Sequence, residues 1–284
     1  MFYSEPRHRQ PLRIISAAST GIMFVFLLGY IYTLFSIYMP FVYFKFIITA
    51  GLGFAIGYLT RFLAFAFKIT GVQNKILLGV LLSFFTYYFH WIAYILFLMW
   101  EKYPDLKTFF SNAGMITRPM FFQIIYNFYS HGAWTLFGIP FKGLALGIVW
   151  LIEAFLVFAL PVKIILEDKP KPFSFNTNLW YPVYSLSEKF KLNLSKPQLL
   201  KQLKENPLTA IEKLGKGSHF DNLNIYLYYL EEEQQQYISF INNRYDKKGN
   251  LKTQFIIENF KIDKQTAQKI LQKYPYKKNK LRFI

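Results

Sequence analysis

Two ionisable side chains lie in stretches of sequence that are otherwise largely apolar. Glu153 is the only charged residue between Leu144 and Val162, and His90 lies in FFTYYFHWIAY, residues 84–94. Ionisable groups inside a membrane are costly, usually face the interior of a helix bundle, and often mark functional sites. Because a carboxylic acid and an imidazole can share a hydrogen bond or a proton, we predict that Glu153 and His90 form an intramembrane polar pair.

The predicted Glu153–His90 pair has two interpretations. It could be a proton-sensitive site, with the tyrosines beside His90 as further hydrogen-bond donors. It could also be a structural hydrogen bond that holds two helices together. We favour the structural interpretation, because one pair without a relay of acids is thin evidence for transport.

Other motifs for catalysis or ligand binding fail on residue type or spacing. The chain has no cysteine, which excludes disulfides, iron–sulfur clusters and cysteine nucleophiles. Its four histidines are scattered, and GKGS at 215–218 lacks the spacing of a phosphate-binding loop. We therefore expect no catalytic residues, no metal site and no cofactor, and an enzyme is the less favoured class.

The composition indicates a membrane protein with a soluble tail. Hydrophobic residues make up 53% of the chain and charged residues 17%, against about 25% charged in an average soluble domain. Residues 1–166 hold 12 Lys+Arg and 4 Asp+Glu, whereas residues 167–284 hold 21 and 12. We predict an α-helical polytopic membrane domain over 1–166, followed by a small soluble α+β domain.

Four segments are long enough to cross a bilayer, which takes roughly 20 apolar residues in a helix. They are residues 15–37, 42–67, 76–100 and 143–165. Residues 119–139 could be a fifth span, but they carry Gln123, Asn127 and His131 among aromatic residues that suit the membrane interface. We predict an interfacial or re-entrant element there. A true fifth span is the alternative, and it would move the tail to the other side.

Lysine and arginine residues give the orientation of the predicted spans. Their distribution favours both termini in the cytoplasm. The abundance of Lys, Asn, Ile, Phe and Tyr suggests an AT-rich bacterial genome, and we predict a protein of the bacterial inner (plasma) membrane. The cations that we expect at the membrane surface are Arg7, Arg9, Arg13, Arg61, Lys68 and Lys163.

Glycines in the second span indicate close helix packing. Gly51, Gly53 and Gly57 lie close together in AGLGFAIGY, and the last two have the GxxxG spacing that lets another helix approach. We favour packing inside the bundle, and a dimer interface is the alternative.

The polar tail divides into two parts. Residues 167–194, with Pro170, Pro172 and Pro182, are predicted to be a linker. Residues 195–284 are predicted to form a cytoplasmic α+β domain. It would contain helices starting at Ser195 and after Asp263, and three strands, NLNIYLYYL, QYISFINNRY and LKTQFIIENFKI.

Two functions from different classes fit these features. We favour a non-enzymatic multi-pass membrane protein that anchors a basic cytoplasmic domain for binding or assembly with partner proteins, including copies of itself. Membrane lipid is an expected partner and nucleic acid is not, because the lysines are spread along a tail tethered at an anionic leaflet. The alternative is a small transporter or proton-coupled channel subunit that uses Glu153 and His90.

Overall fold

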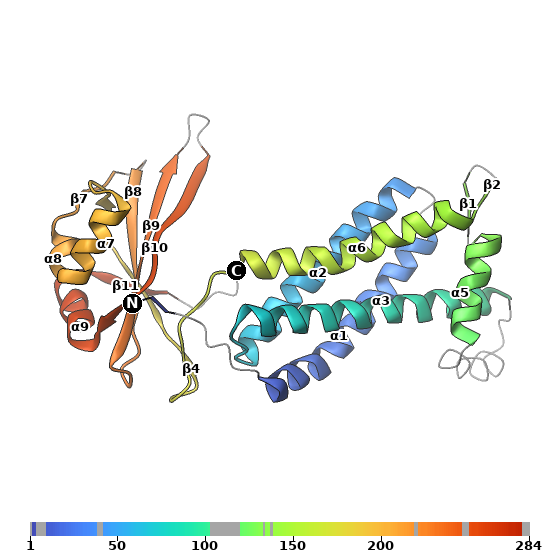
Figure 1. Cartoon of the computed structure of the whole chain (residues 1–284), viewed down its shortest axis with the longest axis horizontal. Helices are drawn as coiled ribbons and strands as arrows, with labels where there is room; N and C mark the ends of the chain where they lie inside the picture. The colour runs from blue at the N-terminus through green and yellow to red at the C-terminus, as the bar shows by residue number, and fades with distance from the viewer. Residues whose placement is uncertain are drawn as a thin grey trace. The chain divides into compact units, whose positions relative to one another are not determined.

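The computed structural model describes residues 2–3, 10–38, 42–102, 120–132, 134–136, 139–218, 221–245 and 250–279. The chain divides into two compact units, which we describe separately (Figure 1). The helical unit is Arg7–Lys169, and the sheet unit is Pro170–Ile284 together with Met1–Pro6. Two of the predicted surface cations, Arg7 and Arg9, lie outside the described residues.

Four long apolar helices form the body of the helical unit. They are α1 (Pro11–Tyr38), α2 (Val42–Ala66), α3 (Val72–Lys102) and α6 (Gly143–Glu167). Each contains a stretch that is long and apolar enough to cross a membrane. Their outer faces are apolar as well, with Met23 78% and Leu151 71% exposed. Within the residues that the structure describes, the prediction of four apolar helices is confirmed, and these helices support a multi-pass integral membrane protein.

Small residues bring these helices close together. Helix α1 packs on α3, α2 packs on α6, and α3 also contacts α6. A Cβ atom on Gly29 of α1 would lie 2.9 Å from the carbonyl oxygen of Thr86 in α3, so only glycine fits this approach. Val25, Ile56 and Leu82, from three different helices, are fully buried in the core of the bundle.

Helix α5 (Met120–His131) lies in the segment for which we predict an interfacial or re-entrant element. Its 12 residues extend about 18 Å, which is less than the hydrocarbon core of roughly 30 Å. A short antiparallel pair follows, made of β1 (Trp134–Leu136) and β2 (Ile139–Phe141). Within the described residues, this segment is therefore a short helix and a pair of short strands, and its position in the membrane stays a prediction.

The sheet unit contains an antiparallel sheet of long and short strands that is covered by helices. The sheet runs in the order β10–β9–β8–β5–β11, and β6 and β7 pair beside β8. Helices α7, α8 and α9 lie on one face of this sheet (Figure 1). The strands are β5 (Val183–Leu186), β6 (Phe190–Lys191), β7 (Gly215–Lys216), β8 (Asp221–Tyr228), β9 (Gln235–Tyr245), β10 (Leu251–Asp263) and β11 (Tyr276–Asn279).

Local signals explain the helices of the sheet unit. They are α7 (Lys196–Glu205), α8 (Pro207–Glu212) and α9 (Lys264–Lys273). Ser195 forms a capping box with Gln198 at the start of α7. Asp263 caps α9 by accepting a hydrogen bond of 2.8 Å from the Thr266 amide. The helix starts predicted at these residues are confirmed, as are three strands in the order β8, β9 and β10.

The predicted linker, residues 167–194, is not a linker in the structure. It holds the hairpin of β3 (Phe173–Ser174) and β4 (Leu179–Trp180), and then β5, which lies between β8 and β11. Its prolines lie beside strands and not inside them. Proline has no backbone N–H, so at these positions it does not remove a hydrogen bond from the sheet. The carbonyl of Pro182, just before β5, accepts a hydrogen bond from the Tyr229 amide. A domain starting at residue 195 would therefore lack a central strand.

The beginning of the chain also belongs to the sheet unit. Phe2 forms a β-bridge with Phe260, and the Tyr3 amide donates to the Asn259 carbonyl at 2.8 Å. The rings of Tyr3 and Tyr237 meet edge to face, with centroids 5.3 Å apart. The chain thus enters the helical unit from the sheet unit and returns to it after α6, which the sequence pattern did not predict.

Candidate functional site

Glu153 lies in the middle of the buried face of α6. Buried residues recur on this helix every three or four positions, at Leu146, Val149, Glu153 and Val157, so the helical period itself turns the carboxylate toward the other helices. Glu153 is ten residues from the start of α6, or about 15 Å along its axis. Its side chain is only 2% exposed.

The partner of Glu153 is Lys45, which lies in the first turn of α2. Its Nζ is 2.8 Å from Oε1 of the carboxylate, and its side chain is 16% exposed. A lysine near a helix end can extend its apolar stem along the bundle and place the ammonium at a different depth from its Cα atom. The ion pair lets both charges stay inside the bundle, because each offsets the desolvation of the other.

His90 has other partners and is not the partner of Glu153. Its Nδ1 lies 2.8 Å from Oγ1 of Thr33 in α1. The same hydroxyl lies 2.8 Å from the Gly29 carbonyl. When Thr33 donates to Gly29, its oxygen can accept from Nδ1–H of a neutral imidazole. The predicted Glu153–His90 hydrogen bond is therefore replaced by two separate contacts, because a lysine is a stronger partner for a carboxylate.

The two predicted residues still belong to one polar cluster, which Tyr32 connects. The Tyr32 ring lies 4.5 Å from the His90 ring between centroids, and its hydroxyl is 2.8 Å from Oγ1 of Thr49. The Thr49 hydroxyl in turn donates to the Lys45 carbonyl at 2.7 Å, which joins this group to the Lys45–Glu153 pair. We call Lys45, Glu153, His90, Thr33, Tyr32 and Thr49 the inner polar cluster.

The inner polar cluster contains one positive and one negative group, Lys45 and Glu153, whose charges can cancel. With Lys45 protonated and Glu153 ionised, the charges cancel. Transfer of one proton from Nζ to the carboxylate would leave both groups neutral, so the pair has no net charge in either state. Such a pair can serve as a structural link between α2 and α6 or as a proton-sensitive element, which are the two roles considered for Glu153 from the sequence.

The sequence contained a signal for Lys45. It stands in VYFKFIITA at the start of an apolar span, so it faces the same desolvation problem as Glu153. In the distribution of Lys and Arg that gives the orientation, it counts simply as one cation on the side opposite to the termini. A search for the opposite charge on the neighbouring span would have identified the pair.

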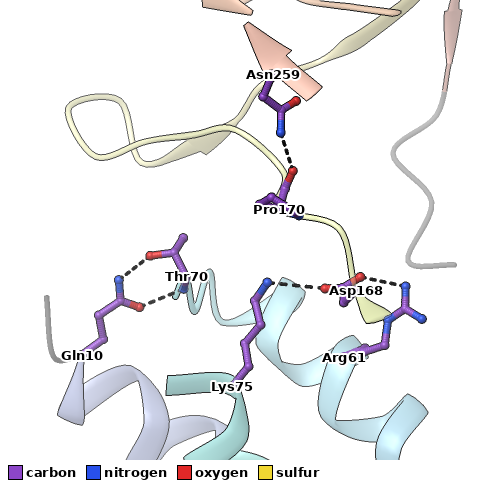
Figure 2. Close-up of polar contacts among 7 residues, drawn as sticks. All are labelled: Gln10, Arg61, Thr70, Lys75, Asp168, Pro170 and Asn259. Carbon is purple, nitrogen blue, oxygen red and sulfur yellow. Dashed lines mark hydrogen bonds and ion pairs between the residues drawn. The ribbon is translucent and has the colours of Figure 1, made fainter. Parts of the chain in front are cut away.

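A second group of charges lies at the other end of the helical unit. Asp168 follows the last residue of α6, where the helix dipole disfavours a negative charge. Figure 2 shows Arg61 and Lys75 directed at this carboxylate from α2 and α3. Their nitrogens lie 2.8 and 3.4 Å from its oxygens. Arg61, predicted to be a simple surface cation, thus also links α2 to α6.

Further contacts at this end hold the start of α1. The side-chain amide of Gln10 makes two hydrogen bonds with Thr70 (Figure 2). Its Nε2 donates to Oγ1 of Thr70 at 2.8 Å, and its Oε1 accepts from the backbone amide of Thr70 at 3.1 Å. Arg13 donates to the Lys68 carbonyl at 2.7 Å. Lys68 itself has a positive φ of 57° after α2.

In the sheet unit, Asn259 donates to the Pro170 carbonyl at 2.8 Å (Figure 2).

The glycines of α2 are divided between two environments. A Cβ on Gly53 would lie 2.8 Å from the Leu156 carbonyl oxygen, and one on Gly57 would lie 2.4 Å from Cδ1 of Ile164. Both glycines therefore face α6 within the chain. A Cβ on Gly51 would meet nothing within 4 Å. The close approach is thus an internal packing contact in this chain, as favoured from the sequence.

Comparison with known proteins gives no functional assignment. No protein-family model, no curated protein and no solved structure matches the chain.

Proposed function

We propose that this protein is a non-enzymatic, multi-pass membrane protein that holds a basic sheet unit at the cytoplasmic face of a bacterial inner membrane, where it assembles with partner proteins. The observation that carries the proposal is that residues 2–3 and residues 170–279 belong to the same unit. Four spans return a chain to the side where it started, which agrees with a sheet unit that contains both ends.

The distribution of charge supports the cytoplasmic side. Arg13, Arg61, Lys68 and Lys75 lie at the end of the helical unit from which the chain leaves toward the sheet unit. Cytoplasmic ends of membrane spans carry an excess of such residues. On the opposite side, the short connection between α1 and α2 has Lys45 nearby, which is engaged by Glu153. The longer connection between α3 and α6 adds Lys102, Lys107, Arg118 and Lys142, so the excess on the cytoplasmic side is moderate.

The helices of the sheet unit offer a surface for an acidic partner. Their outward side carries exposed lysines, among which Lys273 is paired with Glu212. An excess of positive charge favours rapid association with an acidic protein surface. The exposed lysines of this surface, which we call the lysine face, are Lys196, Lys201, Lys204, Lys213, Lys269 and Lys273.

Site-specific photo-crosslinking in cells tests this proposal. A photoreactive residue at Lys201 or at Lys269 should give the same discrete protein adduct, and Lys204→Glu should reduce its yield. A photoreactive residue at Leu151, on the outer face of α6, is the matched control and should not give this adduct. No protein adduct from either position of the lysine face would contradict the proposal.

A second candidate function is a subunit of a transporter or proton-coupled channel. The observation in its favour is the buried Lys45–Glu153 pair, because ionisable groups inside membranes commonly serve transport. Reconstituted protein should then carry a proton flux that Glu153→Gln abolishes while the protein remains folded. Equal flux in vesicles with and without the protein would contradict this candidate.

A further inference from the structure

A groove runs along the outer side of the helical unit between α3 and α6. Its volume is about 610 Å³. Its walls are apolar, formed by Val80 of α3 and by Phe155, Phe158, Ala159 and Val162 of α6. We call it the α3–α6 groove. Phe155 is 69% exposed, so the groove opens to the surroundings of the bundle and is not part of its core.

The surroundings of the groove are lipid if α6 crosses the membrane. Residues 155, 158, 159 and 162 fall on one side of the helix, so the apolar wall follows the helix axis. Ala159 is the smallest of them and leaves the space that makes the groove. An acyl chain is apolar and linear and would lie along such a wall, replacing contacts that a bulky side chain would otherwise make.

The groove ends in two opposite charges. Lys163 and Glu167 line its end nearest the C-terminus of α6, and both side chains are exposed. They are four residues apart, about 6 Å along the axis, and Lys163 is the nearer to the membrane centre. In a phospholipid the phosphate is joined to the glycerol, and any amine lies beyond it. The order of charges along α6 therefore matches the order of groups in a zwitterionic headgroup.

We propose that the α3–α6 groove binds one phospholipid whose headgroup carries a phosphate and a primary ammonium, as in phosphatidylethanolamine. One acyl chain lies along Phe155, Ala159 and Val162. Nζ of Lys163 donates to the phosphate, and the Glu167 carboxylate accepts from the ammonium. Phosphatidylcholine lacks N–H donors, and phosphatidylglycerol has only neutral hydroxyl donors in place of the ammonium, so neither can make the charge-assisted second contact.

Native mass spectrometry of the delipidated full-length protein tests this proposal. The protein would be titrated with phosphatidylethanolamine, phosphatidylcholine and phosphatidylglycerol of identical acyl chains. The parent should bind the first most tightly, by about threefold, which is the effect of an exposed ion pair. Glu167→Gln should remove this preference, Lys163→Gln should weaken all three lipids, and Ala159→Leu should weaken all three by filling the groove.

Lys142→Gln is the matched control, because this exposed lysine precedes the opposite end of α6 and should leave every titration unchanged. Circular dichroism of each variant checks that the helices are intact. Should Ala159→Leu fail to fold, the two charge variants decide the result. Equal binding of the three lipids to the parent, or an unchanged preference in Glu167→Gln, would overturn the proposal and leave only non-selective lipid contact.

Discussion

Lys45 and Glu153 form an ion pair across α2 and α6, with 2.8 Å between Nζ and Oε1. This pair connects the first turn of one span with the centre of another. Removing one partner of a buried pair leaves an uncompensated charge, whereas removing both can be nearly neutral. The pair therefore makes a prediction about stability that is independent of any activity.

We expect Glu153→Leu to destabilise the protein in mild detergent by about 3 kcal/mol, the usual cost of stranding a buried charge. Lys45→Leu in the same chain should restore most of that loss. Thermal unfolding of the two single variants and the double variant measures the coupling between them. His90→Leu should couple to Glu153→Leu much less, because His90 bonds to Thr33. Stronger coupling to His90 than to Lys45 would contradict the observed pairing.

The glycines of α2 provide a matched comparison. Gly53→Ala should lower the stability by about 1–3 kcal/mol through overpacking, because its Cβ would lie 2.8 Å from the backbone oxygen of Leu156. Gly51→Ala should be neutral or slightly stabilising, because its Cβ meets open space and alanine is the better helix former. Thermal unfolding in detergent separates the two. Equal effects would show that α6 does not approach α2 at Gly53.

The secondary-structure elements were predicted better from the sequence than the contacts between them. Apolar length and composition were sufficient for the four spans, and capping residues such as Ser195 and Asp263 marked the helix starts. The prediction of a Glu153–His90 hydrogen bond was wrong, because two ionisable residues in two apolar spans need not lie on facing sides. Helix rotation and neighbour order decide which side chains meet, and neither is encoded in one span alone.

The prediction that the soluble domain begins at residue 195 was wrong for a different reason. The short strand β5 has only four residues between proline-containing segments, so its local pattern resembles that of a linker. Its place between β8 and β11 depends on pairing with residues more than 40 positions away, at Tyr226 and Lys277. The bridge of Phe2 to Phe260 is more distant still. Long-range pairing of such short segments leaves no periodic signal.

The position of β5 predicts which fragment of the tail folds. Residues 170–284 should be soluble and unfold cooperatively, whereas residues 195–284 should not, because removal of β5 separates β8 from β11. Circular dichroism and denaturant unfolding of both fragments provide the measurement. Adding Leu186→Asp to the longer fragment is a control that places a charge in the core next to the helices. Cooperative unfolding of the shorter fragment would contradict the sheet order.

We expect the stability of the sheet unit to depend on pH through the carboxyl group of Asp263. Hydrogen bonds from the side chain and amide of Thr266 lower the pKa of the Asp263 carboxyl below its ordinary value of 3.8. A lowered folded pKa stabilises the sheet unit fully above pH 3.8, and this contribution is lost as the pH falls from there through the folded value. Asp263→Asn should keep the cap but remove this part of the acid dependence.

Asp263→Ala serves as the comparison at neutral pH. It should cost about 1 kcal/mol by leaving the first turn of α9 without a cap, while Asp263→Asn should cost little. Urea unfolding of the 170–284 fragment at pH 7 and at pH 3 measures both effects. An identical loss of stability between these pH values in the parent and in Asp263→Asn would show that the carboxylate is not responsible.

The last prediction concerns the direction of the chain through the membrane. Four spans place the connection between α3 and α6 on the side opposite to the sheet unit. A reporter fused after Lys107, which is outside the described residues, should therefore be on the non-cytoplasmic side of the membrane, and one fused after Lys171 should be cytoplasmic. A reporter inserted after Gly71, between α2 and α3, should match the Lys171 fusion and controls for the orientation of the first hairpin. The same side for Lys107 and Lys171 would require another crossing between α3 and α6. It would also place Phe2 and Phe260, which pair in one unit, on opposite sides of the membrane.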